Sequence, residues 1–169
     1  MKSVRELQGL LAWTVGVTIL LIVPVCALAS HLIYNRTASL PIGWYWVERS
    51  VKPVRGDMVA FPVPVSVKGL VHERRYLPDG AYLVKMVVGM AGDFVCMQDG
   101  VFTVNDAVVG SVLTTDSAGR ALPRVDVCEQ VAPGEIYVAS GHPRSFDSRA
   151  FGAVKAAEIR GKVTRLWAY

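Results

Sequence analysis

An uninterrupted apolar segment near the N-terminus constrains this chain most. Residues 7–30 are 24 consecutive residues without a charged side chain, and most are Leu, Val, Ile or Ala. As an α-helix rising about 1.5 Å per residue, the segment would span about 36 Å, more than the hydrocarbon core of a bilayer. We therefore expect residues 1–33 to be a membrane anchor and residues 34–169 to form a separate domain.

The charges before this segment favour one orientation. Lys2 and Arg5 precede the apolar residues, as in an anchor whose N-terminus is cytoplasmic. A cleavable secretory signal is the alternative, because Ala27-Leu28-Ala29 resembles a cleavage site. The apolar core of a signal peptide usually has about 7–15 residues, so the greater length here favours the anchor. We expect a single-pass protein of the inner (cytoplasmic) membrane, contacting lipid through this helix, with residues 34–169 in the periplasm.

Composition excludes several classes of protein. The chain is 52% hydrophobic and 19% charged, which is too apolar for a disordered chain. Residues 34–169 carry 16 Lys and Arg against 13 Asp and Glu, without a basic cluster, so we expect no nucleic-acid partner. The three histidines are scattered, and the cysteines match no zinc spacing, so we expect no metal and no cofactor.

Two cysteines, Cys96 and Cys128, lie beyond the apolar segment. An exported domain can keep a disulfide, so these two cysteines, 32 positions apart, could pair. The alternative is two buried free thiols.

Short strand-like segments separated by Gly and Pro predict an all-β domain of mainly antiparallel sheets. Asn105-Asp106 reads as a tight hairpin turn. We expect a loop excursion at 62–80 and one weak helix at 153–160. The expected strands are 44–48, 58–61, 82–88, 94–98, 101–104, 107–109, 136–139 and 162–167.

Two side chains break the local pattern. Ser39 precedes Leu-Pro in a turn shortly after the apolar segment, which would expose its hydroxyl; an ordinary juxtamembrane turn is the alternative. Lys85 is the single charge in an apolar strand. Burial would lower its pKa and make the amine a candidate general base. The alternative is an edge strand on which Lys85 points into water.

A polar segment, residues 140–149, follows directly after an expected strand. Asp147 and Arg149 are two positions apart, so in extended backbone they share a face and could form an ion pair. A solvated loop is the alternative.

The order of these segments resembles the type I signal peptidase family, and more closely its conjugative-transfer (TraF-type) branch. The similarity covers the anchor and most of the remaining chain. Four boxes occur in the family's order: Ser39-Leu40-Pro41-Ile42-Gly43, then 55–61, then 85–93, then Ser145-Phe146-Asp147-Ser148-Arg149. The Gly-Asp-Asn that usually opens the last box is replaced by Gly141-His142-Pro143.

This resemblance implies a serine protease with a Ser/Lys dyad. Ser39 would be the nucleophile and Lys85 the general base, oriented by Ser145. The Ser39 backbone N–H and the Thr37 hydroxyl would hold the oxyanion. Asp147 and Arg149 would brace the site through their ion pair.

The resemblance also implies the substrate class. It would be an exported precursor with small residues at positions −1 and −3 of its signal peptide, bound as an extended strand, and the branch points to a conjugative pilin precursor. Two other functions are consistent with the residues. One is a hydrolase using Ser39, His142 and Asp147, and the other is a non-enzymatic membrane-anchored β-domain of a secretion or conjugation apparatus.

Overall fold

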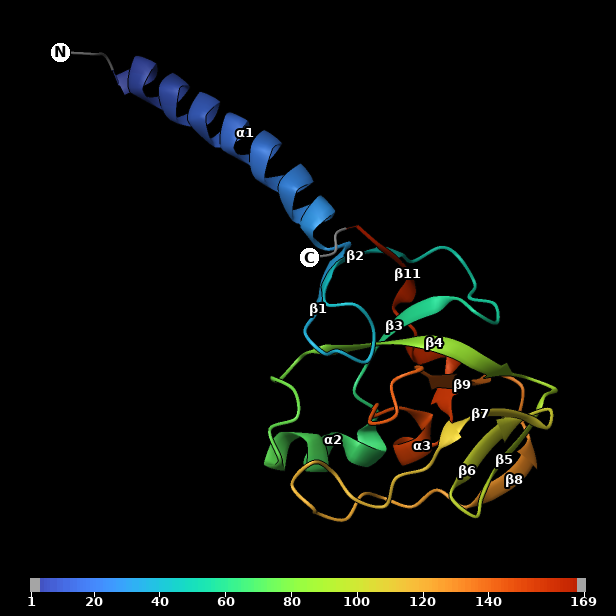
Figure 1. The fold of residues 1–169 in the computed structure, drawn as a ribbon. Coiled ribbons are helices and arrows are strands. Elements are labelled where there is room, and N and C mark those ends of the chain that lie inside the picture. Colours follow the sequence, from blue (N-terminus) through green and yellow to red (C-terminus); the bar gives the residue numbers. More distant parts are fainter. Residues whose placement is uncertain (1–3, 167–169) are drawn as a thin grey trace. The chain divides into compact units, whose positions relative to one another are not determined.

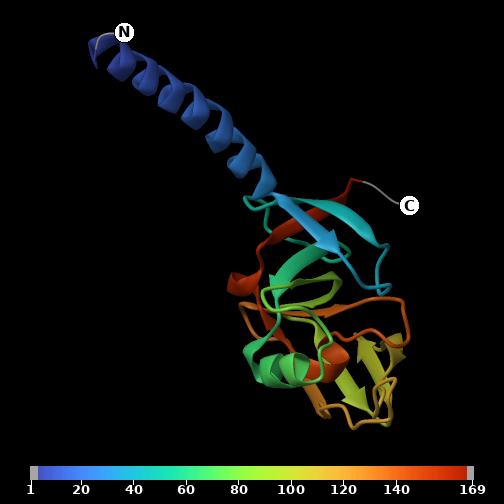
Figure 2. The same ribbon diagram turned by 90° about the vertical axis from the view of Figure 1, so that its left-hand side faces the viewer.

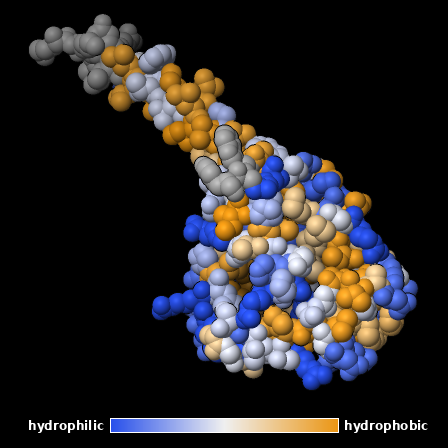
Figure 3. All heavy atoms as spheres, in the orientation of Figure 1, coloured by the Kyte–Doolittle hydropathy of each residue, from blue (hydrophilic) through white to orange (hydrophobic). Residues whose placement is uncertain are grey.

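The structure, a computed structural model, describes residues 4–166, and they separate into two compact units with the boundary between Leu32 and Ile33. The first unit contains helix α1, Val4–Ala29. Its segment Gln8–Ala29 is long and apolar enough to cross a membrane, with a mean hydropathy of 2.4. Apolar residues dominate this helix in Figure 3. The expected N-terminal apolar helix is thus confirmed.

The second unit is built from two β-sheets (Figure 1). The larger sheet has seven strands in the order β1-β2-β11-β3-β4-β9-β10, and the smaller has four in the order β7-β6-β5-β8. All pairs of known register are antiparallel, which confirms the expected fold class. The larger sheet contains β1 Leu32–Asn35, β2 Gly43–Glu48, β3 Met58–Pro62, β4 Tyr82–Met90, β9 Glu135–Ala139, β10 Val154–Lys155 and β11 Gly161–Arg165. The smaller contains β5 Phe94–Gln98, β6 Val101–Val104, β7 Ala107–Ser111 and β8 Val127–Gln130.

Side chains from both faces of the larger sheet are buried. On one face, Val59, Leu83 and Val138 pack with Val67 of helix α2, Val65–Glu73, and Phe151 of helix α3, Ser148–Phe151. Helices α2 and α3 lie side by side against this sheet (Figure 2). On the other face, alternate side chains of β3 and β4 join the core of β1, β2 and β11. Strand β4 is therefore buried on both faces.

Strand β4 has one edge that is only partly paired. Strand β3 pairs with Tyr82–Met86 along one edge, whereas β9 pairs only with Met86–Met90 along the other. Within the described part of the chain, no strand pairs with the residues from Tyr82 to Lys85 on the β9 side. This free segment of strand edge ends at Lys85.

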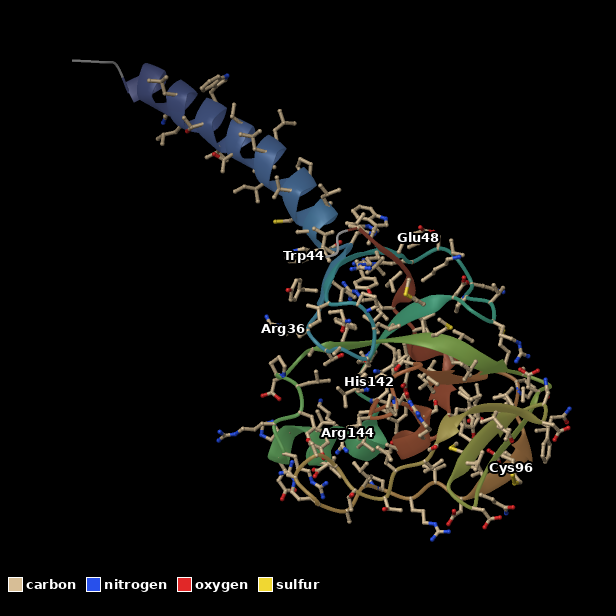
Figure 4. All side chains as sticks on the ribbon, viewed as in Figure 1. Arg36, Trp44, Glu48, Cys96, His142 and Arg144 are labelled. Carbon is tan, nitrogen blue, oxygen red and sulfur yellow. A yellow bond between two sulfur atoms is a disulfide. The ribbon has the colours of Figure 1, made fainter. Side chains whose placement is uncertain are left out.

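The smaller sheet contains the predicted hairpin and the two exported cysteines. Asn105 and Asp106 have φ of 49° and 66°, the left-handed conformation of a tight hairpin turn, so that prediction is confirmed. Cys96 on β5 lies opposite Cys128 on β8, and the two form a disulfide. Figure 4 labels Cys96 in this sheet.

Two expectations about local structure are wrong. Residues 62–80 are not all loop, because they contain α2, whose Val67 and Val71 are four positions apart and face the core together. Residues 153–160 do not form an α-helix: Val154 pairs with Ile136 in strand β10, and a 3-10 turn, Ala156–Glu158, follows. Core packing of Val154 outweighs the helical propensity of the alanines nearby.

Candidate active site

The Ser39 hydroxyl is presented by the loop between β1 and β2. Asn35, at the end of β1, is 3% exposed, and its side chain holds this loop from the inside. Its amide donates to the carbonyl oxygens of Thr37 and Leu40 at 3.0 Å and of Pro41 at 3.1 Å. Its Oδ1 accepts from the Thr37 backbone N–H at 3.3 Å and faces the Thr37 hydroxyl at 3.2 Å. The backbone on both sides of Ser39 is therefore fixed by one buried amide.

The other end of the loop is held by a buried tyrosine. Tyr45 is fully buried on β2, and its hydroxyl donates to the Pro41 carbonyl at 2.8 Å. Burial raises the pKa of Tyr45, so this hydroxyl keeps its proton and remains a donor.

Lys85 reaches this loop from β4. Its side chain is 2% exposed, and β4 is an interior strand of the larger sheet, so Lys85 is buried as the apolar strand predicts, and the alternative of a solvated edge lysine is wrong. Its Nζ lies 2.5 Å from Ser39 Oγ and 3.0 Å from Ser145 Oγ. The amine therefore bridges two hydroxyls that come from segments 106 positions apart in the chain.

The environment of Lys85 favours the neutral amine. Desolvation by burial lowers the pKa of Lys85 from 10.5 to about 8. Asp147 opposes this shift by its negative charge, and Arg149 adds a smaller lowering. The apolar strand predicts that burial lowers the pKa of Lys85. It does not predict the effect of Arg149, because that residue is 64 positions away in the chain.

Asp147 and Arg149 form the expected ion pair, and it is buried. Arg149 Nε and Nη2 donate to the two carboxylate oxygens at 2.8 and 2.7 Å, with the side chains 5% and 0% exposed. Arg149 Nη2 also donates to the carbonyl oxygens of Ser140 and His142 at 3.2 and 3.1 Å. The ion pair thus fixes the backbone of the loop that carries Ser145.

Two donors lie beside the Ser39 hydroxyl. The Thr37 hydroxyl is 3.1 Å from Ser39 Oγ. The Ser39 backbone N–H makes no hydrogen bond with any residue that the structure describes. The Ser39 N–H is placed to interact with an additional acceptor at this point, and the Thr37 hydroxyl would do so by turning its proton away from Asn35 Oδ1.

The structure brings together Thr37, Ser39, Lys85 and Ser145, and it places Asp147 and Arg149 next to them. It does not bring His142 to Ser39. His142 Nδ1 accepts the backbone N–H of Arg144 at 3.1 Å, and Asp147 is engaged by Arg149. Figure 4 labels His142 and Arg144 on the loop that precedes α3. Within residues 4–166, His142 has no hydrogen bond to Ser39 or Asp147, so the histidine-based arrangement is not formed.

Asn35 and Tyr45 hold the Ser39 loop but were not among the residues expected at the site. An Asn at a strand end, two positions before a Thr, is a common signal for a side chain that satisfies nearby backbone groups. That signal could have identified Asn35 as part of the turn around Ser39, but not its three carbonyl partners.

Comparison with known sequences identifies the family to which a chain with this fold and this cluster belongs. The family described as signal peptidase, peptidase S26, matches residues 4–168, and the chain belongs to this family. A plasmid transfer protein TraF from Escherichia coli is 33% identical over 137 residues, covering 74% of this chain and 76% of the relative. A conjugal transfer protein TraF from Agrobacterium fabrum (strain C58) is 31% identical, covering 75% and 77%.

These relatives confirm the conjugative-transfer branch that the sequence motifs resemble. Among solved structures, a signal peptidase I from Enterococcus faecalis V583 is 26% identical, with a TM-score of 0.41; the similarity covers 68% of this chain and 98% of that one.

Proposed function

We propose that this protein is a membrane-anchored serine endopeptidase that removes signal peptides from exported precursors, with Ser39 as the nucleophile and Lys85 as the general base. The observation that carries the proposal is the buried Lys85 amine, 2.5 Å from the Ser39 hydroxyl and 3.0 Å from that of Ser145. A nucleophile within hydrogen-bond reach of a base that a third group orients is the arrangement covalent catalysis requires.

The first half of the reaction forms an acyl-enzyme. Ser39 Oγ attacks the scissile carbonyl carbon while its proton passes to the neutral Lys85 amine. The carbonyl oxygen becomes an oxyanion, which accepts hydrogen bonds from the Ser39 backbone N–H and the Thr37 hydroxyl. Lys85 then donates its proton to the leaving amine as the peptide bond breaks. The new N-terminus departs, and an ester between Ser39 and the signal peptide remains.

The second half restores the enzyme. A water molecule replaces the departed amine and loses a proton to Lys85 as its oxygen attacks the ester carbonyl. The C–O bond to Ser39 breaks, and the serine oxygen takes back a proton from Lys85. Ser145 keeps the amine oriented throughout, while Asp147 and Arg149 hold the Ser145 loop.

The free edge of β4 supports an extended substrate. The residues from Tyr82 to Lys85 offer unpaired main-chain groups on one side, so a peptide can add there as a strand and bring its scissile bond to Lys85. Small residues at positions −1 and −3 follow from the family resemblance. Membership of the conjugative-transfer branch makes a pilin precursor the proposed substrate.

The proposed topology is an uncleaved α1 in the inner membrane with the β-domain in the periplasm. The length and hydropathy of Gln8–Ala29 support a membrane span. A reporter that fluoresces only in the cytoplasm, fused after Tyr169, should stay dark. A bright fusion would reverse the orientation.

The test of the catalytic proposal is precursor processing by Ser39→Ala and Lys85→Ala. Each should abolish cleavage while the protein accumulates at its normal level. Ser66→Ala and Lys68→Ala, at exposed positions, are the matched controls and should process normally. Normal cleavage by either variant of the dyad would overturn the proposal, and so would a requirement for His142.

A further inference from the structure

A cavity of about 210 Å³ begins at Ser145, one side chain away from Lys85. Its apolar wall is formed by Leu113, Leu122, Pro143, Phe146 and Ala150. Cavities of about 150 Å³ in protein interiors already accept a benzene ring, so this one can accept a branched or aromatic side chain.

Two charged groups of the cavity, Asp116 and Arg149, are already satisfied by other protein groups, whereas the Arg144 side chain at the rim makes no ion pair with any residue that the structure describes. Asp116 accepts from the Tyr76 hydroxyl at 2.5 Å and from Arg120 Nε at 2.7 Å. Arg149 is bound to Asp147 and to backbone carbonyls. What the cavity offers to a ligand is therefore mainly apolar surface.

The cavity lies on the side of the dyad where the leaving group must be. Ser39 Oγ and Ser145 Oγ both lie within hydrogen-bond distance of Lys85 Nζ, so the amine connects the proposed nucleophile to the rim of the cavity. The amine that leaves has to receive its proton from Lys85, so the chain after the scissile bond passes Lys85 and continues toward Ser145. An extended chain advances about 3.3 Å per residue, which brings the first or second residue of the mature protein to the cavity.

We infer that this cavity is the subsite for the side chain of the first or second residue after the cleavage site, and that it selects a large apolar side chain there. The inference rests on the proposed Ser39/Lys85 function. Recognition is thus divided between two places. The edge of β4 binds the signal peptide, and the cavity beside Ser145 binds the start of the mature chain.

The test is a set of peptides with one constant signal-peptide half and Ala, Leu, Phe, Lys or Asp at the first or second mature position. The wild-type protein should cleave the best Leu or Phe peptide with kcat/KM about tenfold above the Ala peptide, and the Lys and Asp peptides no better than Ala. Ser117→Trp, at the exposed rim of the cavity, should cut the kcat/KM of the Leu and Phe peptides down to that of the Ala peptide. Ala118→Trp, on the same exposed turn but not lining the cavity, is the matched control and should keep the wild-type preference.

Equal kcat/KM for all five side chains at both positions would overturn the inference, as would a preference that survives Ser117→Trp. A second measurement separates this inference from the catalytic proposal. A six-residue peptide with Leu at the favoured position, titrated against methyl-labelled protein, should shift the methyl signals of Leu113, Leu122 and Ala150. Shifts without cleavage of any peptide would refute the catalytic proposal and leave a peptide-binding cavity. Cleavage without shifts would refute the subsite.

Discussion

The side-chain amide of Asn35 lies 3.0 Å from the carbonyl oxygen of Leu40, so a single residue on β1 spans the turn that carries Ser39, the proposed nucleophile. The same Nδ2 contacts two further carbonyls, and Oδ1 contacts Thr37. Without Asn35, the Pro41 carbonyl would keep the Tyr45 hydroxyl as a donor, but the carbonyls of Thr37 and Leu40 would lose theirs, so the position of Ser39 depends on this amide.

Asn35→Ala should lower kcat by about 100-fold with little change in KM, because small displacements of a nucleophile are costly to rate. Asn35→Asp should be equally impaired, since a carboxylate keeps the acceptor for Thr37 but faces three carbonyl oxygens without a donor. Steady-state kinetics on variants with native circular dichroism measures this. Asn105→Ala, which removes an amide from the distant hairpin turn, should keep kcat. An Asn35→Ala protein with wild-type kcat would show that the turn holds itself.

Activity should rise with pH through a midpoint near 8, because Lys85 acts as a base only after losing its proton and burial lowers its pKa to about 8. Lys85→Arg should be as inactive as Lys85→Ala, since a guanidinium stays protonated. Processing of a precursor by purified protein over a pH series provides the measurement. If Lys85→Arg cleaved at a near-normal rate, Lys85 would have only a structural role.

Lys85 should also make stability depend on pH. Its pKa is about 8 in the folded protein and about 10.4 in an unfolded chain, so between these values the unfolded state binds more protons. The free energy of unfolding of the wild type, relative to Lys85→Met, should therefore rise by about 3 kcal/mol from pH 8 to pH 10.5 and stay constant below pH 8. Denaturant titrations of both proteins at several pH values test this. A pH-independent difference would mean that Lys85 is not desolvated.

The buried pair of Asp147 and Arg149 should be intolerant of single substitutions. Asp147→Asn or Arg149→Met leaves an unpaired buried charge and should lower the free energy of unfolding by about 3–5 kcal/mol. The double variant should lose less than the sum of the two. Arg124 and Asp126 form an exposed ion pair, so disrupting it should change stability by about 0–1 kcal/mol. Additive losses at Asp147 and Arg149 would show that the two residues act independently.

The disulfide between Cys96 and Cys128 should contribute to stability but not to chemistry. It closes a loop of 32 residues, which corresponds to about 3–4 kcal/mol in the chain-entropy model. Cys96→Ser with Cys128→Ser should lower the unfolding free energy by that order while kcat remains unchanged at 25 °C. Thiol labelling of the unreduced, denatured wild type should modify only Cys26. Three reactive thiols would exclude the disulfide.

The sequence predicted most strands because alternation of apolar residues and turn signals are local. It failed at Val154, where one side chain enters the core beside β9, and at α2, where a helix with few apolar positions is stabilised by packing. It missed β1, which follows soon after the long apolar segment, and β8, whose mostly exposed side chains show no apolar alternation.

The site was predictable in its residue types but not in its connections. A lone lysine in an apolar strand and a serine before Leu-Pro are visible in the sequence, and the family motifs link them. The bridge from Lys85 to Ser145, and the Arg149 contacts with two loop carbonyls, depend on segments brought together by the sheets. No local signal encodes such distances.

The edge of β4 that ends at Lys85 offers main-chain groups, and these look alike for every residue except proline. A substrate that binds by strand addition is selected by its conformation more than by its side chains. A segment that is still helical, or already folded into a domain, has no free amides and carbonyls to pair with this edge. Binding at this edge therefore depends on when the segment is unfolded. On the proposed function, a precursor would be cut only during the interval when its junction has been released from one structure and has not yet entered the next.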